Sequence, residues 1–145
     1  MTYNPASSGV VNSLPIGDEF YNDTGSLISK ATPLTVNTVS GFAEIIDVSS
    51  TESEVSFGVA FADTEPTSTG NYITMGVIEN VGISANFGDE IYVSKSGGLT
   101  NVAPDIGVGG FVSGDAIIFV GTIKKNNTNP LLKDLVISID IRGIL

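Results

Sequence analysis

Acidic side chains are the first candidates for chemistry in this sequence, because it contains no histidine and no cysteine. Without these two residue types, the usual nucleophilic triads cannot form and most transition-metal sites lose their preferred ligands. Paired carboxylates are the remaining route to acid–base catalysis. The two candidate pairs are Asp18 with Glu19 and Asp89 with Glu90.

These carboxylates do not have the spacing of a catalytic pair. Neighbouring residues on a strand point to opposite faces of a sheet, so neither pair converges on one bond. We interpret all four as solvated surface acids and predict no catalytic residue. A hydrolase that brings distant carboxylates together is a third class of function that the sequence leaves open.

Other motifs give no cofactor or metal site. The segment Gly107-Val108-Gly109-Gly110-Phe111 lacks the Lys-Ser/Thr of a phosphate loop, and Asp63-Thr64-Glu65 offers two ligands before Pro66. The triplets Asn22-Asp23-Thr24 and Asn126-Asn127-Thr128 match the N-glycosylation pattern. No secretory signal is visible at the amino terminus, so we interpret both matches as chance.

The charge balance argues against two classes of partner. The formal net charge is −10, and the six basic residues are scattered along the chain. Nucleic-acid binding needs a basic stripe and an anionic membrane surface repels such a chain, so we predict neither partner. No apolar run is long enough for a membrane-spanning helix. The charge suits a cationic patch on a protein partner, and solubility explains it equally well.

Hydrophobic periodicity predicts an all-β fold. Side chains alternate at 55–61 and at 135–142, and Ala116 to Val120 form an apolar run typical of a strand covered on both faces. Further strands are expected near 17–23, 33–39, 42–48, 72–83 and 89–94. Turn signals separate them at 23–25, 40–41, 69–71, 96–98 and 113–115. This pattern indicates a compact β-barrel or sandwich, without a bound cofactor.

Two pseudo-repeated halves and an extended N-terminal arm complete the expected organisation. Gly17-Asp18-Glu19-Phe20-Tyr21 recurs as Gly88-Asp89-Glu90-Ile91-Tyr92, and Pro66 and Pro130 each lead to an alternating strand. Each copy is expected to open with a turn and to close a hairpin at Gly-x-Leu, 25–27 and 97–99. The single β-domain then spans 17–145, with repeats at about 17–75 and 88–145.

Residues 1–16 are small and polar and are interrupted by prolines, so we expect them to form the arm. Within it, contacts to a partner or protomer are expected from six residues: Tyr3, Asn4, Pro5, Val10, Val11 and Leu14.

The stretch from Gly88 to Thr100, followed by Pro104 and the strand Ile118 to Ile123, resembles a module of small bacteriophage capsid decoration, cement and head-fibre proteins. A weaker copy lies at 17–58, so the resemblance covers about half of the chain. It implies a homo-oligomer, often a trimer, on the outside of a capsid between subunits of the major capsid protein. The matching residues are turn and core positions, so no binding residue carries over.

The sequence therefore favours a non-enzymatic virion protein that is assembled in the host cytoplasm and stabilises the capsid exterior. The alternative is a tail-fibre or surface-carbohydrate-binding module. It would need exposed aromatic rings beside acids or amides, for example Tyr21, Tyr92 and Asn22 on one face.

Overall fold

The fold is all-β, as expected from the sequence. The computed structural model describes residues 15–49 and 56–145, and these residues form nine strands and no helix. The strands are β1 (Ile16–Tyr21), β2 (Pro33–Val36), β3 (Ala43–Ile45), β4 (Gly58–Ala60), β5 (Thr69–Ile78), β6 (Glu90–Val93), β7 (Leu99–Thr100), β8 (Ala116–Lys125) and β9 (Lys133–Ile144). Several end earlier than the alternation predicts, because it continues into the adjoining loops.

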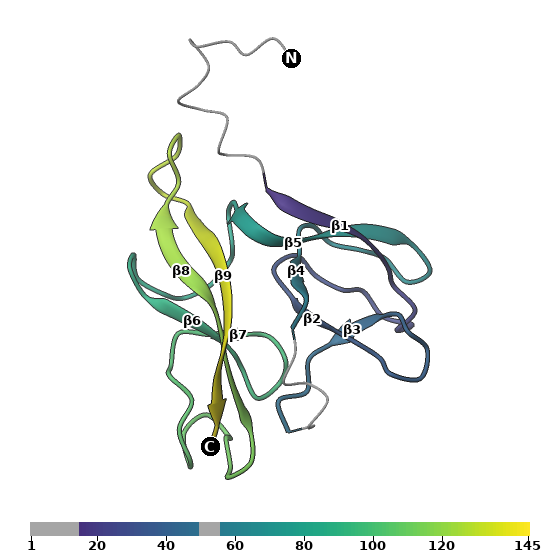
Figure 1. Ribbon diagram of the computed structural model, residues 1–145. Coiled ribbons are helices and arrows are strands. Elements are labelled where there is room, and N and C mark those ends of the chain that lie inside the picture. The colour runs from purple at the N-terminus through teal and green to yellow at the C-terminus, as the bar shows by residue number, and fades with distance from the viewer. Residues whose placement is uncertain (1–14, 50–55) are drawn as a thin grey trace, which may run out of the picture.

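The strands form one antiparallel sheet that curls into a half-barrel, with order β3-β2-β4-β5-β9-β8-β6-β7. Strand β5 joins the two halves (Figure 1). Its residue Ile73 pairs with Gly17 of β1 and with Val59 of β4. Two residues further on, Met75 pairs with Ile16 of β1 and with Ser138 of β9. One edge of β5 therefore holds β1, while β4 and β9 share the other edge.

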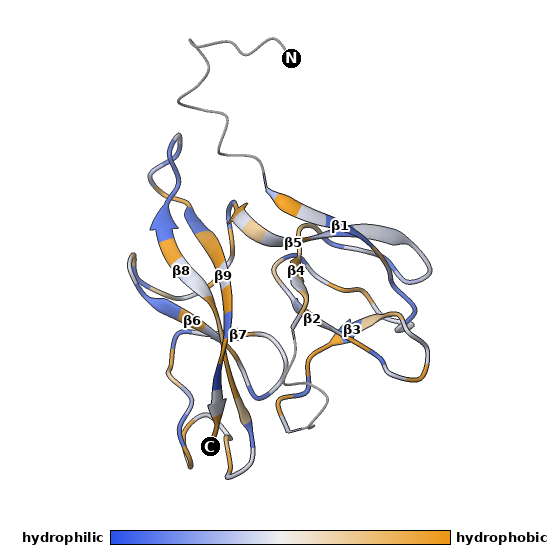
Figure 2. Cartoon of the chain, viewed as in Figure 1, coloured by the Kyte–Doolittle hydropathy of each residue, from blue (hydrophilic) through white to orange (hydrophobic). Residues whose placement is uncertain are grey.

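Two clusters of buried hydrophobic side chains form the core. The larger cluster draws its members from both halves of the sheet, and Ile118 and Ile123 of β8 and Leu135 of β9 are among its fully buried members. The smaller cluster includes Phe20 and Leu34. Figure 2 shows the hydrophobic stretches of β8 and β9 and the hydrophilic ends of both strands at their shared hairpin.

The alternation at the C-terminus is confirmed over its first part. Leu135 and Ile137 are buried and Ile139 packs against the larger cluster, whereas Ile141 is exposed. The pattern at 55–61 is not confirmed as a single buried face. Val59 and Ala60 are both fully buried, because β4 is covered on both faces by the two clusters.

Four of the five turn signals are confirmed. Gly25, Gly41, Gly97 and Gly114 lie at turns and adopt positive φ angles between 78° and 97°. The expected turn at 69–71 is wrong, because these residues begin β5. Gly70 is there a strand glycine, and its missing side chain leaves room for that of Thr64.

The Gly-x-Leu hairpin is confirmed in the second copy and wrong in the first. Residues 97–99 join β6 to β7 and bring Leu99 against the core. Leu27 is exposed instead, and the next residue, Ile28, forms a bridge with Thr64. In the first copy, β1 pairs with the distant β5, so Gly25 opens a long loop rather than a hairpin.

The two Gly-Asp-Glu motifs occupy different structural settings. Gly88 lies in a turn with φ 89°, whereas Gly17 lies inside β1 next to a β-bulge. The glycine that matches Gly17 in space is Gly121, which follows a bulge in β8. Both matched glycines are sites of close approach. A Cβ on Gly17 would lie 1.8 Å from the carbonyl oxygen of Tyr72, and one on Gly121 would lie 1.9 Å from that of Val136.

The match extends along both strand pairs. Gly17 pairs with Ile73 and Gly121 with Ile137, and both ladders continue in the same register to their ends. An asparagine follows each ladder at the same distance, Asn22 in one and Asn126 in the other. The turns that start β5 and β9 contain Pro66 and Pro130 at matching positions. The pairs β1–β5 and β8–β9 are therefore equivalent units.

The expected arm falls almost entirely outside the described residues. Its six expected contact residues (Tyr3, Asn4, Pro5, Val10, Val11 and Leu14) all lie there. The last residue assigned to the arm, Ile16, is part of β1 and pairs with Met75.

Candidate interaction surface

Among the four carboxylates singled out in the sequence, Asp18 and Asp89 accept hydrogen bonds from neighbouring backbone N–H groups. Asp18 and Glu19 are exposed on β1, where Asp18 Oδ1 accepts a hydrogen bond from the Glu19 backbone N–H at 2.8 Å. Asp89 Oδ2 accepts from the Asn86 backbone N–H and from the Asn101 amide. These two hydrogen bonds lower the pKa of Asp89. Within the described residues, no group of three or more acidic side chains could hold a metal ion.

Glu90 belongs to a surface cluster around Arg142. The Tyr92 hydroxyl donates to Glu90 Oε1 at 3.1 Å, and Arg142 donates to Glu90 Oε2 at 3.3 Å. The guanidinium lies 4.0 Å from the centre of the Phe119 ring, a cation–π contact that covers the ring. Burial and the hydrogen bond to Glu90 raise the pKa of Tyr92. The cluster ties β6, β8 and β9 together on the outer face.

Buried asparagines hold the ends of the equivalent strand pairs. The Asn22 side chain is fully buried, and its amide donates to the carbonyl oxygens of Ser26 and Thr64. Its Oδ1 accepts from the backbone N–H and the hydroxyl of Thr24, which forms an Asx turn. Asn126 makes the same turn with Thr128. Both glycosylation-like triplets are therefore turns whose asparagine nitrogens face inward and are hydrogen-bonded.

Asn126 is also part of a buried ionic group. Its amide lies 3.1 Å from both carboxylate oxygens of Asp134, which is 1% exposed. Asp134 accepts further hydrogen bonds from the Asn80 backbone N–H and from Lys124. Burial by itself would raise the pKa of Asp134, but these donors outweigh it and hold the pKa below its usual value.

A second buried carboxylate joins the loop after β6 to the start of β8. Asp115 is 1% exposed, and Lys95 donates to both of its oxygens at 2.8 and 2.7 Å. The Val112 backbone N–H donates to the same carboxylate. The hydrogen bond from Lys95 and the one from Val112 lower the pKa of Asp115. In the described residues, every buried side-chain nitrogen or oxygen has a hydrogen-bond partner.

Large apolar side chains, by contrast, remain on the surface. Val39 and Leu131 are 96% and 88% exposed at turns. Ile16 and Met75, which pair across β1 and β5, are 59% and 60% exposed. Other exposed apolar residues are Leu27, Val36, Phe42, Ile45, Phe61, Phe87, Val102, Ile106, Val108, Val112, Ile141 and Ile144. Scattered exposed residues are ordinary, but an adjacent pair on a sheet edge is a contact candidate.

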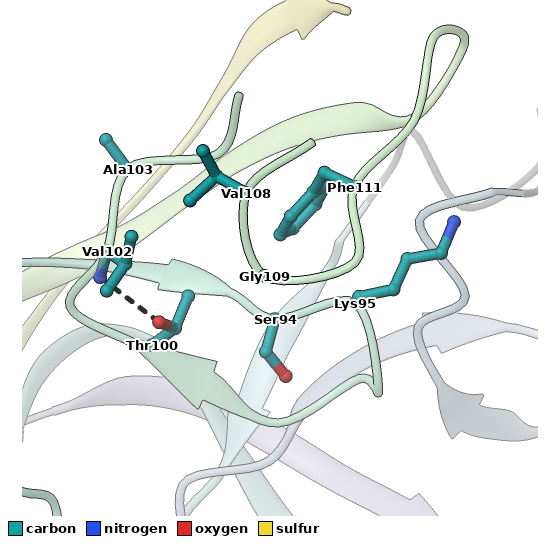
Figure 3. A pocket seen from close by; sticks show the side chains of 8 residues that line it. All are labelled: Ser94, Lys95, Thr100, Val102, Ala103, Val108, Gly109 and Phe111. Atoms are coloured by element: carbon teal, nitrogen blue, oxygen red, sulfur yellow. Dashed lines mark hydrogen bonds between the residues drawn. The ribbon is translucent and has the colours of Figure 1, made fainter. Parts of the chain in front are cut away.

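The cavities near the described residues are small or shallow. The glycine-rich segment 107–111 borders a pocket of about 40 Å³, between Thr100, Val102 and the inward-pointing Phe111 ring (Figure 3). That volume suits a few water molecules at most. A shallow hollow of about 240 Å³ lies beside β1, over Tyr72 and Phe61. A third of about 390 Å³ is bordered by Phe61, Glu79, Lys124, Asn127 and Asp134, among others.

The face expected for sugar binding does not form. Asn22 is fully buried and Tyr92 is 7% exposed beneath Arg142. Tyr21 lies in the other half of the sheet and packs on Phe42, with ring centres 5.1 Å apart. The sequence carried a signal for the role of the two asparagines that was missed: Asn followed by Thr two residues later, directly after a strand, is typical of an Asx turn.

Comparisons with protein families, curated proteins and solved structures find no match for this chain. The described residues contain no helix long and apolar enough to cross a membrane.

Proposed function

We propose that this chain is a non-enzymatic structural protein that binds the outer surface of a bacteriophage capsid and stabilises it. One observation supports this function more than any other. The buried polar side chains of the described residues are all hydrogen-bonded within the protein, in turns and ion pairs. Apolar side chains such as those of Ile16 and Met75, in contrast, are exposed on the sheet. A surface of this kind suits burial against a partner.

The partner in this proposal is the major capsid protein, and the resemblance of residues 88–100 to decoration proteins supports that choice. The net charge of −10 favours a cationic patch on the shell. Repeated copies on a symmetric shell would add avidity to a modest single contact. A homo-oligomer, in first place a trimer, is part of the same proposal.

A truncation tests the contribution of the arm. Deletion of residues 1–14 leaves β1 complete, because Ile16 and its pairing with Met75 are retained. We expect the truncated chain to fold, to occupy empty shells less fully and to protect them less against heat. A variant with unchanged occupancy and heat protection would show that the β-body makes the contact alone.

Sugar binding is the second candidate, and the hollow of about 390 Å³ favours it. Phe61, 39% exposed, borders this hollow together with Glu79, Asn127 and Lys124. An aromatic ring beside acid and amide groups is the combination that a sugar ring requires. Glycan-array binding that is lost in Phe61→Ala would favour this candidate over capsid binding.

A further inference from the structure

In the described part of the chain, the outer edge of β1, which faces away from β5, has no partner strand. On that side, β3 makes only a single parallel bridge, between Ala43 and Asn22, the residue directly after β1. The equivalent strand β8 is different. It pairs with β9 on one edge, as β1 does with β5, and with β6 on the other edge. The described residues therefore leave the place beside β1 that corresponds to β6 unfilled.

Individual backbone atoms show what this place would bind. Ile123 of β8 donates its N–H to the Asp89 carbonyl at 3.1 Å and accepts from the Gly88 N–H at 2.7 Å. Glu19 holds the matching position in β1, two residues after the bulge glycine. Its N–H is instead hydrogen-bonded to the neighbouring Asp18 carboxylate. A donor that binds the segment just before β6 in one half is thus capped by a side chain in the other.

A shallow hollow lies on the face of the sheet beside β1. It has a volume of about 240 Å³, and its lining of Pro15, Gly17, Phe61 and Tyr72, among others, spans β1 and the adjoining β5. Gly17 contributes no side chain to it, and rings form part of its lining. Strand addition to a sheet edge combines main-chain hydrogen bonds with such a pocket for an alternate side chain.

The charge of β1 indicates which kind of strand could add to its outer edge. Asp18 and Glu19 are both exposed on β1, and β1 carries no basic residue. Two copies of β1 side by side would place like charges opposite one another, which destabilises a strand pair. We propose that the outer edge of β1 binds an extended basic segment of a partner protein as an added antiparallel strand. This proposal does not require the partner to be a capsid.

A peptide experiment tests the proposal without any capsid. The probe is a short capped peptide that alternates valine and lysine, and its control replaces each lysine by glutamate. Binding is followed by backbone amide chemical shifts of the full-length protein. We expect the lysine peptide to shift Gly17, Glu19 and Tyr21, and the glutamate peptide to bind at least tenfold more weakly.

Glu19→Pro removes the outward N–H, whereas Glu19→Ala removes the same carboxylate and keeps the N–H. Proline is tolerated on an edge strand when its nitrogen faces away from the ladder, so the amide spectrum should remain that of the folded protein. Since one main-chain hydrogen bond contributes about 1 kcal/mol and 1.4 kcal/mol is tenfold, we expect Glu19→Pro to bind about five- to tenfold more weakly than Glu19→Ala.

Three results would overturn the proposal. The first is equal binding by Glu19→Pro and Glu19→Ala. The second is a set of shifts confined to the other sheet edges, β3 and β7. The third is slow hydrogen exchange of the Glu19 N–H in the free full-length chain that is lost on deletion of residues 1–14, because the chain itself would then fill the edge.

Discussion

Gly17 and Gly121 occupy matching positions in two equivalent strand pairs, and each leaves room for a backbone carbonyl oxygen of its partner strand. Each lies directly after a β-bulge, and a Cβ on either would lie within 2 Å of a carbonyl oxygen of the partner strand, Tyr72 O at 1.8 Å and Val136 O at 1.9 Å. No side chain tolerates such a contact, so the backbone there requires glycine for reasons of space rather than of turn geometry.

We therefore expect Gly121→Ala to destabilise the protein by at least about 2 kcal/mol, because β8 and β9 must move apart in the middle of the core. Chemical denaturation measures this directly. Gly82→Ala is the matched control, since a Cβ on Gly82 meets nothing within 4 Å. A Gly121→Ala variant as stable as Gly82→Ala would contradict the strand pairing described here.

Asn126→Ala should cost about 2–4 kcal/mol, because it leaves the buried Asp134 carboxylate without two of its hydrogen bonds. The neighbouring exposed Asn127 is the control, and its replacement by alanine should change the free energy of unfolding by less than about 0.5 kcal/mol. Similar losses in both variants would mean that Asn126 has no special role at this hairpin.

The buried positions of the Asn22 and Asn126 side chains predict that neither carries a glycan in the folded protein. Both amide nitrogens face inward and are already donors. Intact mass measurement of protein secreted from a glycosylating host checks this. A folded, fully glycosylated product would show that these turns open without loss of the fold.

How much of this could be read from the sequence depends on the distance between interacting residues. The alternation at 135–139 and the apolar run at 116–120 predicted β9 and β8, because a strand's period is local. The turn at 69–71 was wrong, since Gly70 packs against Thr64 in a way that no local rule reveals. The large core cluster was therefore predictable, whereas the close approaches were not.

The repeat shows the same limit. Gly-Asp-Glu occurs at 17–19 and at 88–90, but the first is a bulge in a strand and the second begins in a turn. The true equivalent of Gly17 is Gly121. The sequences that follow these two glycines have in common only an asparagine five residues later and a threonine two residues after that. Strands β2, β3 and β4 lie between β1 and β5 in the chain, whereas a short hairpin joins β8 to β9, so the two units do not align along the chain.

Acid should weaken the fold through Asp115. Its pKa in the folded protein is lowered by Lys95 and by the Val112 N–H. A lowered folded-state pKa gives stability that is present above the unfolded value of about 4 and is lost as the pH falls through the folded value. The free energy of unfolding should therefore fall below about pH 4, and less steeply in Asp115→Asn.

Glu65→Gln serves as the control for that titration, because Glu65 is an exposed residue on a loop. It should follow the wild-type curve closely. If Asp115→Asn and the wild type lost stability in parallel from pH 5 to pH 2, the ion pair with Lys95 would not contribute to acid sensitivity.

Arg142→Ala should lower the free energy of unfolding, because the guanidinium covers Phe119 and bonds Glu90 at the surface. Arg142→Lys should recover part of this loss, since it keeps the charge but not the planar stacking. Thermal unfolding at low and at high salt separates the two contributions. Equal stability of all three proteins would remove the structural role assigned to this cluster.

We propose that this protein acts through surface contact, with its polar groups reserved for its own folding. The most direct measurement is co-sedimentation of the purified chain with mature phage capsids that lack it. We expect saturable binding at a fixed number of copies that matches the symmetry of the shell, together with greater resistance of the shell to heat. Absence of binding at micromolar protein on intact shells would show that the protein does not act in this way.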